Sequence, residues 1–404
     1  MTAKNTNTIR NNKMVKDENI SSVLQLVRDH PLISRIEISK KLNLSPPTVL
    51  RIVAEILDLG LMECTGVGES SGGRKPILYS IKKDAGAIIG VDITKERVKI
   101  GVFNFVGEKL NEYKRKCPNP ADFVNFLVGF LTDVIAEQKS DKIMGIGVGM
   151  SGNVIHESGV VKYSNVFDFQ DVPLKDLLKS HLKYPVFLEE RVHCGALAGK
   201  LLDSSFSDCD IIYMYVGSSI GAGIIIDGKI HYGKGNSISG EVGHMILEKD
   251  GPICSCGSRG CLEQLASESA IVRSLAQELS NGRSSAVCDV IDGDYKKLTG
   301  DIIADAAEKG DALCLEVLDK ACQYLAIVIV DLLMLFNPSK LVITNAICKS
   351  DKLIERLLYK NLAEISSKHF IWKELVVFER DKDRILKGCA LLVMEKVMES
   401  PKLY

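Results

Sequence analysis

The sequence lacks the segments that direct a chain into or across a membrane. Residues 1–19 are polar and contain no apolar core of the kind found in secretory signals. The longest apolar stretch, residues 325–336, is interrupted by Asp331 and is too short to span a bilayer. We therefore expect a cytoplasmic protein that makes no contact with membranes.

The chain also has no excess of charge of one sign, since its 404 residues carry a net charge of −1. The balance hides an asymmetry, because residues 1–80 contain eleven Lys and Arg against eight Asp and Glu. The remaining residues carry forty basic side chains against forty-four acidic ones. A mildly basic first domain on an acidic body is typical of a protein that meets nucleic acid with one end.

A disulfide framework is not expected, although the chain has twelve cysteines. Cysteines of a cytoplasmic chain are more often thiols or metal ligands than disulfide partners. With 46% hydrophobic and 25% charged residues, the composition is that of a globular protein. The length leaves room for two or three domains with sizeable cores.

Capping residues mark two helix starts near the N-terminus. Ser34 and Glu37 have the spacing of a capping box, which predicts a helix that runs to about Leu42. Ser45 followed by Pro46 predicts the start of the next helix, because proline lacks no needed donor at the first helical position. An earlier helix is predicted by the apolar spacing within residues 20–27, and residues 1–16, which contain four basic side chains and no acid, are expected to form a flexible arm.

Two short strands, expected near residues 61–65 and 76–81, flank a glycine-rich loop that ends in Arg74-Lys75-Pro76. Helix-turn-helix spacing followed by such a loop predicts a winged helix-turn-helix DNA-binding domain at residues 17–81. The alternative is a three-helix interaction domain with a solvated basic loop. The candidate DNA contacts are Ser45, Thr48, Arg51, Arg74 and Lys75.

Apolar strands and amphipathic helices alternate after residue 81, which predicts an α/β architecture. Strands are expected at 86–93, 97–104, 144–149, 186–189, 211–216, 222–226 and 340–344, and helices at 121–137, 267–279, 302–308 and 312–336.

One cluster in this body has the spacing of a metal site. His244 is followed by Cys254, Cys256 and Cys261, and three thiols with one imidazole fit a tetrahedral zinc ion. Gly257 and Gly260 permit the sharp turns that would aim the sulfurs at one point. Four protein ligands leave no open position, so we expect a structural ion; the alternative is a cluster of free thiols in a loop.

Taken together, these segments resemble the ROK family, a group of repressors and sugar kinases. The resemblance rests on residues 34–37, 44–45, 48–49, 71–76, 217–223, 240–244 and 254–263. It implies a two-lobed, actin-like (ribonuclease-H-like) sugar kinase fold over residues 82–404, behind the winged helix-turn-helix. Lobe one is expected at about 82–200, lobe two at about 201–387, and a C-terminal helix at 383–399.

The resemblance also implies a sugar site. Glu241, His244 and Glu263 would contact sugar hydroxyls, and the metal loop would hold His244 and Glu263 in place. Gly152 and Asn165 would lie in loops that border the sugar. Without the resemblance, Glu241 and Glu263 would be interpreted as ordinary surface charge.

Three features that active kinases of the family need are altered in this sequence. The turn that cradles ATP phosphates reads residues 92–96, DITKE, and has lost its glycines. The Asn-Asp pair that supplies the general base reads Glu190-Arg191, and an arginine cannot accept that proton. A late Gly-Gly pair reads Asn345-Ala346 after Thr344. We therefore expect neither ATP as a cofactor nor phosphoryl transfer.

Arg191 suggests a hypothesis about the ligand. A guanidinium beside the hydroxyl that receives phosphate in a kinase can pair with a phosphate already present, which favours a sugar phosphate as effector. The alternative is a salt bridge of Arg191 with Glu189 or Glu190.

The resemblance as a whole implies a repressor of sugar metabolism or transport genes, which binds a double-stranded operator as a homodimer or homotetramer and associates with the nucleoid. A sugar or sugar phosphate would control it. Two alternatives stay open: an active ATP-dependent sugar kinase with a regulatory DNA-binding arm, and a repressor controlled by a protein partner.

Overall fold

The computed structural model describes residues 3–68, 75–138, 142–164, 166–202, 209–233, 239–366 and 372–401. The chain forms two compact units, the first of residues 1–194 with 385–404 and the second of residues 195–384. Among the described helices, none combines the length and the apolar character needed to cross a membrane.

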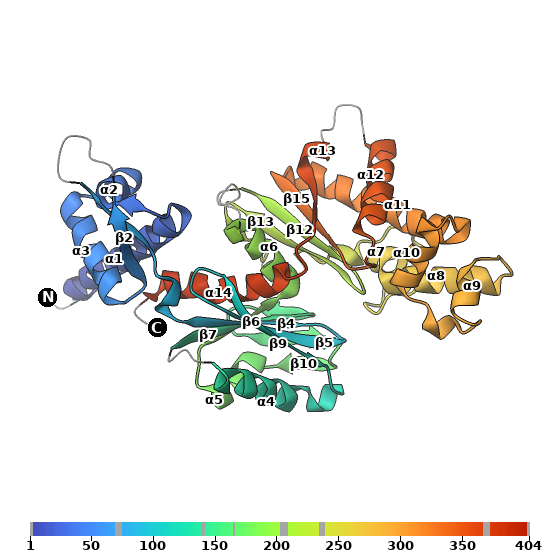
Figure 1. Ribbon diagram of the computed structural model, residues 1–404, viewed down its shortest axis with the longest axis horizontal. Helices are drawn as coiled ribbons and strands as arrows, with labels where there is room; N and C mark the ends of the chain where they lie inside the picture. Colours follow the sequence, from blue (N-terminus) through green and yellow to red (C-terminus); the bar gives the residue numbers. More distant parts are fainter. Residues whose placement is uncertain are drawn as a thin grey trace. The chain divides into compact units, whose positions relative to one another are not determined.

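Residues 3–81 form three helices and a small antiparallel sheet of strand order β1-β3-β2 (Figure 1). Both expected helix caps are present. The Ser34 hydroxyl accepts a hydrogen bond from the Glu37 amide at 3.3 Å, and the Glu37 carboxylate accepts one from the Ser34 amide at 2.9 Å. Ser45 accepts a hydrogen bond from the Thr48 amide at 3.4 Å. The elements are α1 (Ala3–Asp29), β1 (Ile33–Ser34), α2 (Arg35–Leu42), α3 (Pro46–Asp58), β2 (Met62–Val67) and β3 (Ile77–Ile81).

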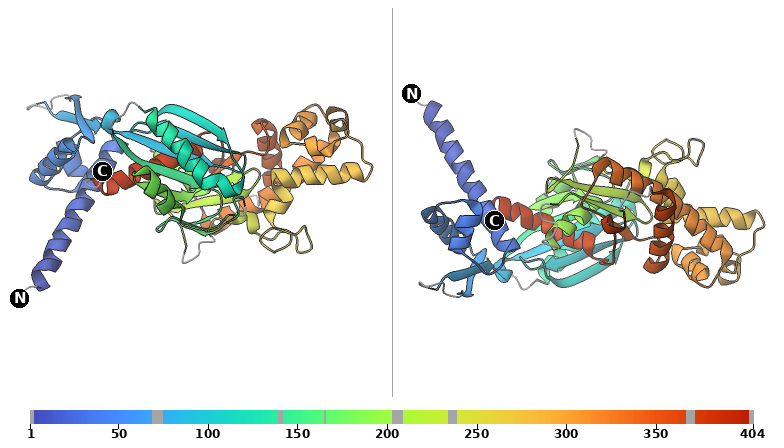
Figure 2. Two further views of the ribbon diagram at one scale, coloured as in Figure 1. Left: turned by 90° about the horizontal axis from the view of Figure 1, so that it is seen from below. Right: turned by 90° about the horizontal axis from the view of Figure 1, so that it is seen from above.

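Residues 1–16 were expected to form a flexible arm, and the described part of this segment belongs to helix α1, which begins at Ala3. Figure 2 shows α1, in dark blue, as one continuous helix. Its C-terminal half is fixed by the core through Ile20, Val23, Leu24 and Val27, which are buried. The segment contains neither proline nor glycine, so a helix that is nucleated there can extend toward the N-terminus one residue at a time.

The rest of the first unit is built on a five-stranded sheet of order β11-β7-β4-β5-β6. Strands β4, β7 and β11 run parallel, whereas β5 and β6 pair antiparallel in a meander. The sheet contains β4 (Ala87–Ile93), β5 (Arg97–Phe103), β6 (Lys109–Lys116), β7 (Ile143–Met150) and β11 (Val186–Glu190). A second, three-stranded sheet contains β8 (Asn153–Ile155), β9 (Val160–Ser164) and β10 (Phe169–Val172), and the helices are α4 (Phe123–Ala136), α5 (Leu174–Leu182), the start of α6 (Arg191–Leu202) and nearly all of α14 (Arg384–Glu399).

Helix α14 lies against this sheet on the face opposite α4 and α5 (Figure 1). Glycines make the contact possible: a Cβ added at Gly147 would stand 1.9 Å from the Cys389 carbonyl oxygen, and one at Gly90 would stand 2.7 Å from that of Leu386. This packing explains why the second unit ends at Arg384 and not at the expected residue 387. The other boundary, after Cys194, lies inside α6, as does the expected boundary at residue 200.

The second unit repeats the same sheet plan, with strand order β14-β13-β12-β15-β16. Again three neighbouring strands, β12, β15 and β16, run parallel, and the two remaining strands form an antiparallel meander. Strands are β12 (Ile211–Val216), β13 (Ile220–Ile226), β14 (Lys229–Ile230), β15 (Lys340–Asn345) and β16 (Val376–Glu379); helices are α7 (Leu262–Ala266), α8 (Glu268–Ser280), α9 (Val287–Val290), α10 (Gly300–Glu308), α11 (Ala312–Phe336), α12 (Asp351–Ile365) and α13 (Trp372–Leu375).

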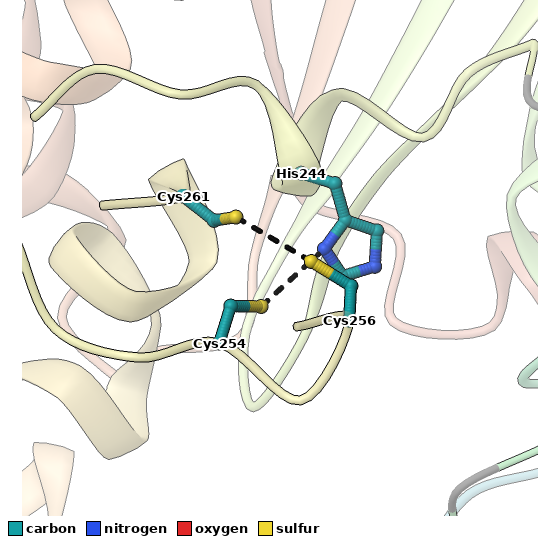
Figure 3. A group of neighbouring side chains, drawn as sticks. All are labelled: His244, Cys254, Cys256 and Cys261. Atoms are coloured by element: carbon teal, nitrogen blue, oxygen red, sulfur yellow. Dashed lines mark hydrogen bonds between the residues drawn. The ribbon is translucent and has the colours of Figure 1, made fainter. Parts of the chain in front are cut away.

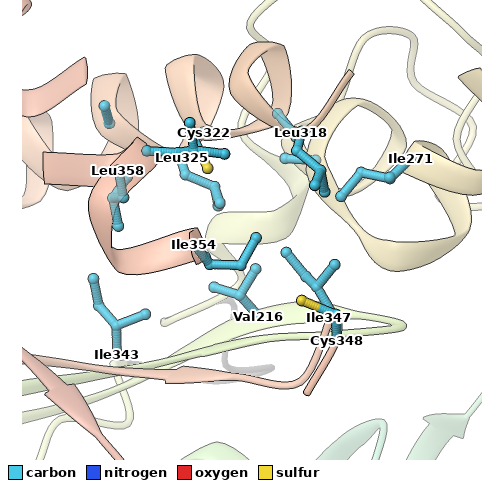
Figure 4. Close-up of a cluster of buried hydrophobic side chains, with 14 of the residues drawn as sticks. Val216, Ile271, Leu318, Cys322, Leu325, Ile343, Ile347, Cys348, Ile354 and Leu358 are labelled. Atoms are coloured by element: carbon cyan, nitrogen blue, oxygen red, sulfur yellow. The ribbon is translucent and has the colours of Figure 1, made fainter. Parts of the chain in front are cut away.

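The core of the second unit lies between this sheet and its helices (Figure 4). The long helix α11 contributes Leu318, Cys322 and Leu325, which pack with Ile343 of the sheet and Leu358 of α12 in one buried cluster. Burial of apolar surface on this scale dominates the stability of the unit. The same core supports the segment 242–266, which carries the predicted metal ligands.

Candidate functional site

The exposed surface of α3 carries the predicted DNA contacts. Ser45 and Arg51 are exposed, and Thr48 is half-buried with its hydroxyl 2.8 Å from that of Ser45. One turn beyond Arg51, Glu55 is paired with Lys16 of α1 at 2.9 Å. The carboxylate that follows Arg51 along the helix is therefore neutralised.

The wing consists of strands β2 and β3 and the loop between them. The Gly68 amide donates a hydrogen bond to the Pro76 carbonyl at 2.8 Å, which closes the described base of the loop. Lys75 is exposed at that base. Arg74 lies outside the described residues, so its predicted contact stays a prediction.

The four predicted metal ligands come together in the second unit (Figure 3). His244 is the last residue of a short 3-10 helix, Val242–His244, which comes after β14 in the chain, and the three cysteines lie in the loop that ends at α7. The ligand atoms of His244, Cys254, Cys256 and Cys261 all lie within 4.8 Å of one another. This juxtaposition is the one that the sequence spacing predicts.

Two distances within this cluster match zinc geometry. A tetrahedral zinc ion with Zn–S bonds of about 2.3 Å and a Zn–N bond of about 2.05 Å has S–S edges of about 3.8 Å and N–S edges of about 3.6 Å. The Sγ atoms of Cys256 and Cys261 are 3.7 Å apart, and His244 Nδ1 lies 3.5 Å from Cys254 Sγ. The residues present therefore fit a Cys3His zinc ion.

The loop backbone brings these ligands together. Gly257 and Gly260 have φ angles of +91° and +64°, a region that side chains with a Cβ rarely adopt. A Cβ at Gly260 would also stand 1.6 Å from the Glu248 carbonyl oxygen. Both glycines are thus needed for the turn, as their place between the cysteines predicts.

The thiols of the loop differ in acidity. A hydrogen bond from the Ser258 backbone is the main cause that lowers the pKa of Cys256 to about 7. Burial raises the pKa of Cys261 to about 12. A metal binds the thiolate, and without a metal the Cys261 thiol keeps its proton at neutral pH. Metal binding at Cys261 would therefore have to supply the free energy that removes this proton.

The predicted sugar-binding side chains of this unit lie at both ends of the metal loop. His244 turns Nδ1 toward Cys254, and its Nε2 lies 3.8 Å from the carboxylate of Glu241. One ring nitrogen can therefore face a metal while the other faces a ligand. The Glu263 carboxylate accepts a hydrogen bond from the Ile220 amide at 3.0 Å, so it is oriented by the glycine-rich segment at the start of β13.

Of the sugar-site residues predicted in the first unit, Arg191 has a partner that was not expected. Arg191, at the start of α6, forms an ion pair with Asp92 at the end of β4, with Nε 2.6 Å and Nη2 3.4 Å from the two carboxylate oxygens. Asp92 belongs to the altered phosphate turn, and neither expectation for Arg191 named it. Gly152 has φ +124°, and a Cβ there would stand 2.5 Å from the Tyr163 carbonyl oxygen, which makes it a backbone requirement of the turn before β8. Asn165 lies outside the described residues.

Sequence comparison now decides the family. The family model described as "ROK family" matches residues 88–396, and one described as "Winged helix-turn-helix DNA-binding" matches residues 16–61. The chain belongs to the ROK family. A xylose repressor of Caldicellulosiruptor bescii is 31% identical to this ROK protein, over 97% of its length and 99% of the relative's. An N-acetylglucosamine repressor of Escherichia coli O157:H7 is 30% identical, over 86% of this chain and 84% of the relative.

Solved structures confirm the expected fold. A ROK family transcriptional regulator, described as a homolog of the E. coli MLC protein, superposes with a TM-score of 0.82 at 24% identity, covering 96% of this chain and 97% of that one. A ROK family glucokinase from Streptomyces griseus, solved with glucose and AMPPNP, gives a TM-score of 0.67 at 26% identity, over 76% of this chain and 99% of the kinase. The regulator match extends over the winged helix-turn-helix, whereas the kinase match leaves about a quarter of this chain uncovered.

Proposed function

We propose that this ROK protein is a transcriptional repressor of sugar transport or metabolism genes. In this proposal the winged helix-turn-helix binds the operator, and the ROK body binds a sugar effector without phosphorylating it. Relatives that match 97% and 86% of this chain are named a xylose repressor and an N-acetylglucosamine repressor, which supports the proposal. Because the body is fused to a DNA-binding domain, a ligand that binds the body can change operator binding.

The observation that carries the proposal is the ion pair between Asp92 and Arg191. Arg191 stands where active kinases of the family have the general base, and a guanidinium cannot take a proton from a sugar hydroxyl. Its partner Asp92 is the first residue of the turn 92–96, which in an active kinase of the family would cradle phosphate. With both the general base and the phosphate turn altered, the body can bind a sugar but cannot transfer phosphate to it. The activity of the protein is then DNA binding by its winged helix-turn-helix.

The proposed DNA interface follows the general geometry of winged helix-turn-helix proteins. The N-terminal part of α3 enters the major groove, with Ser45, Thr48 and Arg51 at bases or phosphates. Arg51 is exposed and forms no ion pair among the described residues. Arg74 and Lys75 of the wing approach the minor groove, whose negative potential attracts cationic side chains where it is narrow.

The proposed effector site uses Glu241, His244 and Glu263 as hydrogen-bonding groups for sugar hydroxyls. Zinc on Nδ1 of His244 would fix the ring so that Nε2 points toward the sugar beside Glu241. Gly152 and Asn165 border the ligand in the same proposal. Effector binding shifts the population of body conformations and thereby the spacing of two DNA-binding domains.

We further propose that the zinc ion is structural, because four protein ligands leave no position for a reacting group. The protein acts in the cytoplasm as a homodimer or homotetramer, since two modest operator contacts held in one assembly raise the effective concentration of the second.

Two measurements on the full chain test the proposal. Fluorescence anisotropy with a duplex from the region upstream of its own gene should show salt-dependent binding that changes when the effector sugar is added. A coupled assay with ATP, magnesium and glucose, xylose or N-acetylglucosamine should show no turnover. Formation of a sugar phosphate at a rate proportional to protein concentration would contradict the proposal, and so would DNA binding that no salt concentration weakens.

A further inference from the structure

Two of the twelve cysteines are exposed, Cys64 in strand β2 of the wing and Cys256 in the metal loop. The other two cysteines of this loop, Cys254 and Cys261, are buried, with 2% and 0% of their surface exposed. Oxidation of a thiol requires that the oxidant reach the sulfur, so it favours exposed cysteines. A soluble oxidant therefore meets the metal loop at Cys256.

A second thiol lies next to this exposed one. The Sγ atom of Cys261 is 3.7 Å from that of Cys256 (Figure 3). A disulfide has an S–S bond of about 2.05 Å, so the two sulfurs would have to approach by about 1.7 Å. In the wing, Tyr79 of strand β3 stands opposite Cys64. Cys256 thus has a thiol within reach, whereas the residue opposite Cys64 offers none.

The backbone around Cys256 leaves room for this approach. The next residue is Gly257, where an added Cβ would meet no atom within 4 Å apart from its neighbours in the chain. Cys261, in contrast, is held in place, since the amide of the following Leu262 donates a hydrogen bond to the Met245 carbonyl at 2.9 Å. The exposed turn that carries Cys256 is therefore the part that moves toward Cys261.

We propose that Cys256 is a site of reversible oxidation by hydroperoxides, and that its oxidation forms a disulfide with Cys261 and dismantles the metal site. This inference rests on the structural zinc ion of the proposed function and adds a form of regulation that is independent of the sugar effector. Zinc, when bound, keeps its cysteine ligands as thiolates, the form of cysteine that attacks peroxides.

The reaction has two steps. The Cys256 thiolate attacks one oxygen of hydrogen peroxide, the O–O bond breaks, and the hydroxide that leaves takes up a proton to give water; Cys256 is now a sulfenic acid. The Cys261 thiolate then attacks this sulfur, the S–O bond breaks, and a second hydroxide takes up a proton. Two thiolates, two protons and one peroxide thus give one disulfide and two waters, and the peroxide is reduced by the two electrons that the sulfurs lose.

The disulfide changes the site around His244. Once Cys256 and Cys261 are joined, His244 and Cys254 are the remaining ligands, and two ligands are too few for a structural zinc ion. The imidazole then loses the bond on Nδ1 that, in the proposed function, fixes its Nε2 beside Glu241. Oxidation at Cys256 thereby acts on a residue of the proposed sugar site.

Zinc release and peptide mapping on the full, zinc-loaded chain test the proposal. Hydrogen peroxide is added in the presence of a chromogenic zinc chelator, the remaining free thiols are alkylated, and the linked peptides are identified by mass spectrometry. About one zinc ion should be released for each Cys256–Cys261 disulfide that forms. The rate should increase in proportion to the peroxide concentration, and reduction in the presence of added zinc should restore the loaded protein.

Two variants assign the chemistry to these two thiols. Cys64→Ser removes the other exposed cysteine and should release zinc at the rate of the wild type. Cys261→Ser removes the thiol that resolves the sulfenic acid, so peroxide should leave Cys256 as a sulfenic acid that dimedone traps. This second readout does not require bound metal, so it holds even if the variant binds zinc weakly. Circular dichroism verifies that each variant is folded.

The possible outcomes separate this inference from the proposed function. Zinc that stays bound at a peroxide concentration that oxidises Cys64 completely would overturn the inference, and so would a disulfide of Cys256 with Cys254 in place of Cys261. A chain that takes up no zinc would contradict the proposed metal site and the release of zinc with it. Operator and sugar binding enter none of these measurements, so a failure of the proposed repressor function would not be mistaken for a failure here.

Discussion

Glu37 makes the DNA-binding domain sensitive to acid. Hydrogen bonds from Ser34 lower the pKa of this carboxyl in the folded protein. A lowered folded pKa means that the ionised form stabilises the fold above the pKa of the unfolded chain, and that this contribution is lost as the pH falls through the folded pKa. Protection of the α2 amides against hydrogen exchange should therefore begin to decrease as the pH falls below about 4.5, the ordinary pKa of a glutamate, and should be lost once the pH has passed the lowered folded pKa.

The variant Glu37→Gln removes this titration. Its α2 amides should be less protected than those of the wild type at neutral pH, and their protection should change little in acid. Glu63→Gln, on the exposed strand β2, serves as the control and should follow the wild type. An acid response in Glu37→Gln as large as that of the wild type would rule out the capping box as its cause.

The metal loop gives a second test at the level of single side chains. Cys256→Ser should lower the bound zinc from about one ion per chain to a small fraction, because serine is a poor ligand for zinc. The loss should also lower the Tm, since an ion on these four ligands would cross-link the cysteine loop to His244. Cys64→Ser is a matched control, because Cys64 is an exposed cysteine of the wing. Elemental analysis of purified protein that shows full zinc content in Cys256→Ser would contradict the ligand set.

Single residues were predictable from sequence where their partners are close along the chain. The cap of Ser34 and Glu37 and the turn glycines at 257 and 260 follow from local spacing. The Asp92–Arg191 pair joins residues 99 positions apart, so no local pattern announces it. A weaker signal existed, since Asp92 and Lys99 are equally distant from the turn between two predicted strands and had to face each other.

At the scale of elements, hydrophobic periodicity predicted the buried strands and helices but missed strands that are exposed or short. Strand β6 has the sequence KLNEYKRK and is almost fully exposed, so it lacks the apolar alternation by which strands are recognised. It forms because β5 offers it an edge to pair with. The small sheet of β8, β9 and β10 was missed for a similar reason, because short strands depend on tertiary contacts.

Helix α14 depends on glycine at a position where periodicity expects nothing special. A Cβ at Gly388 would stand 1.8 Å from the Cys194 carbonyl oxygen of α6. Gly388→Ala should therefore reduce the free energy of unfolding by about 2–3 kcal/mol, because the two helices would have to move apart. Gly129→Ala in α4 is the control: a Cβ there meets nothing within 4 Å. It should raise the free energy of unfolding by about 0.5–1 kcal/mol. Urea unfolding measures both, and equal effects would contradict the close approach.

At the scale of the whole molecule, the separation into a DNA-binding domain and a body predicts which substitutions change the salt dependence of operator binding. Arg51→Ala and Lys75→Ala should each weaken operator binding and reduce the slope of log affinity against log salt by about one. Glu241→Gln should leave that slope unchanged in the absence of sugar. The measurement is anisotropy of a labelled operator duplex over a salt series. A reduced slope in Glu241→Gln would place the body on the DNA.

The two units of the body share one sheet plan, and sequence reasoning assigned the α/β class without seeing the repetition. Strand order, meander and parallel trio are the same in both sheets. The sequence segments differ, however: β6 is charged and exposed, whereas its counterpart β14 has only two residues. Spatial equivalence without similar sequence leaves no period to detect.

The second unit is inserted as one stretch between Cys194 and Ile385 of the first. During synthesis the ribosome therefore completes the DNA-binding domain early, but the sheet of the first unit must wait for α14. Until that helix emerges, the glycine-lined face around Gly90 and Gly147 has nothing to cover it. Translation of an mRNA truncated before the α14 codons would thus yield a chain with a folded DNA-binding domain and an incompletely folded body. Such a chain could compete with the intact protein for operators, and proteases should degrade it.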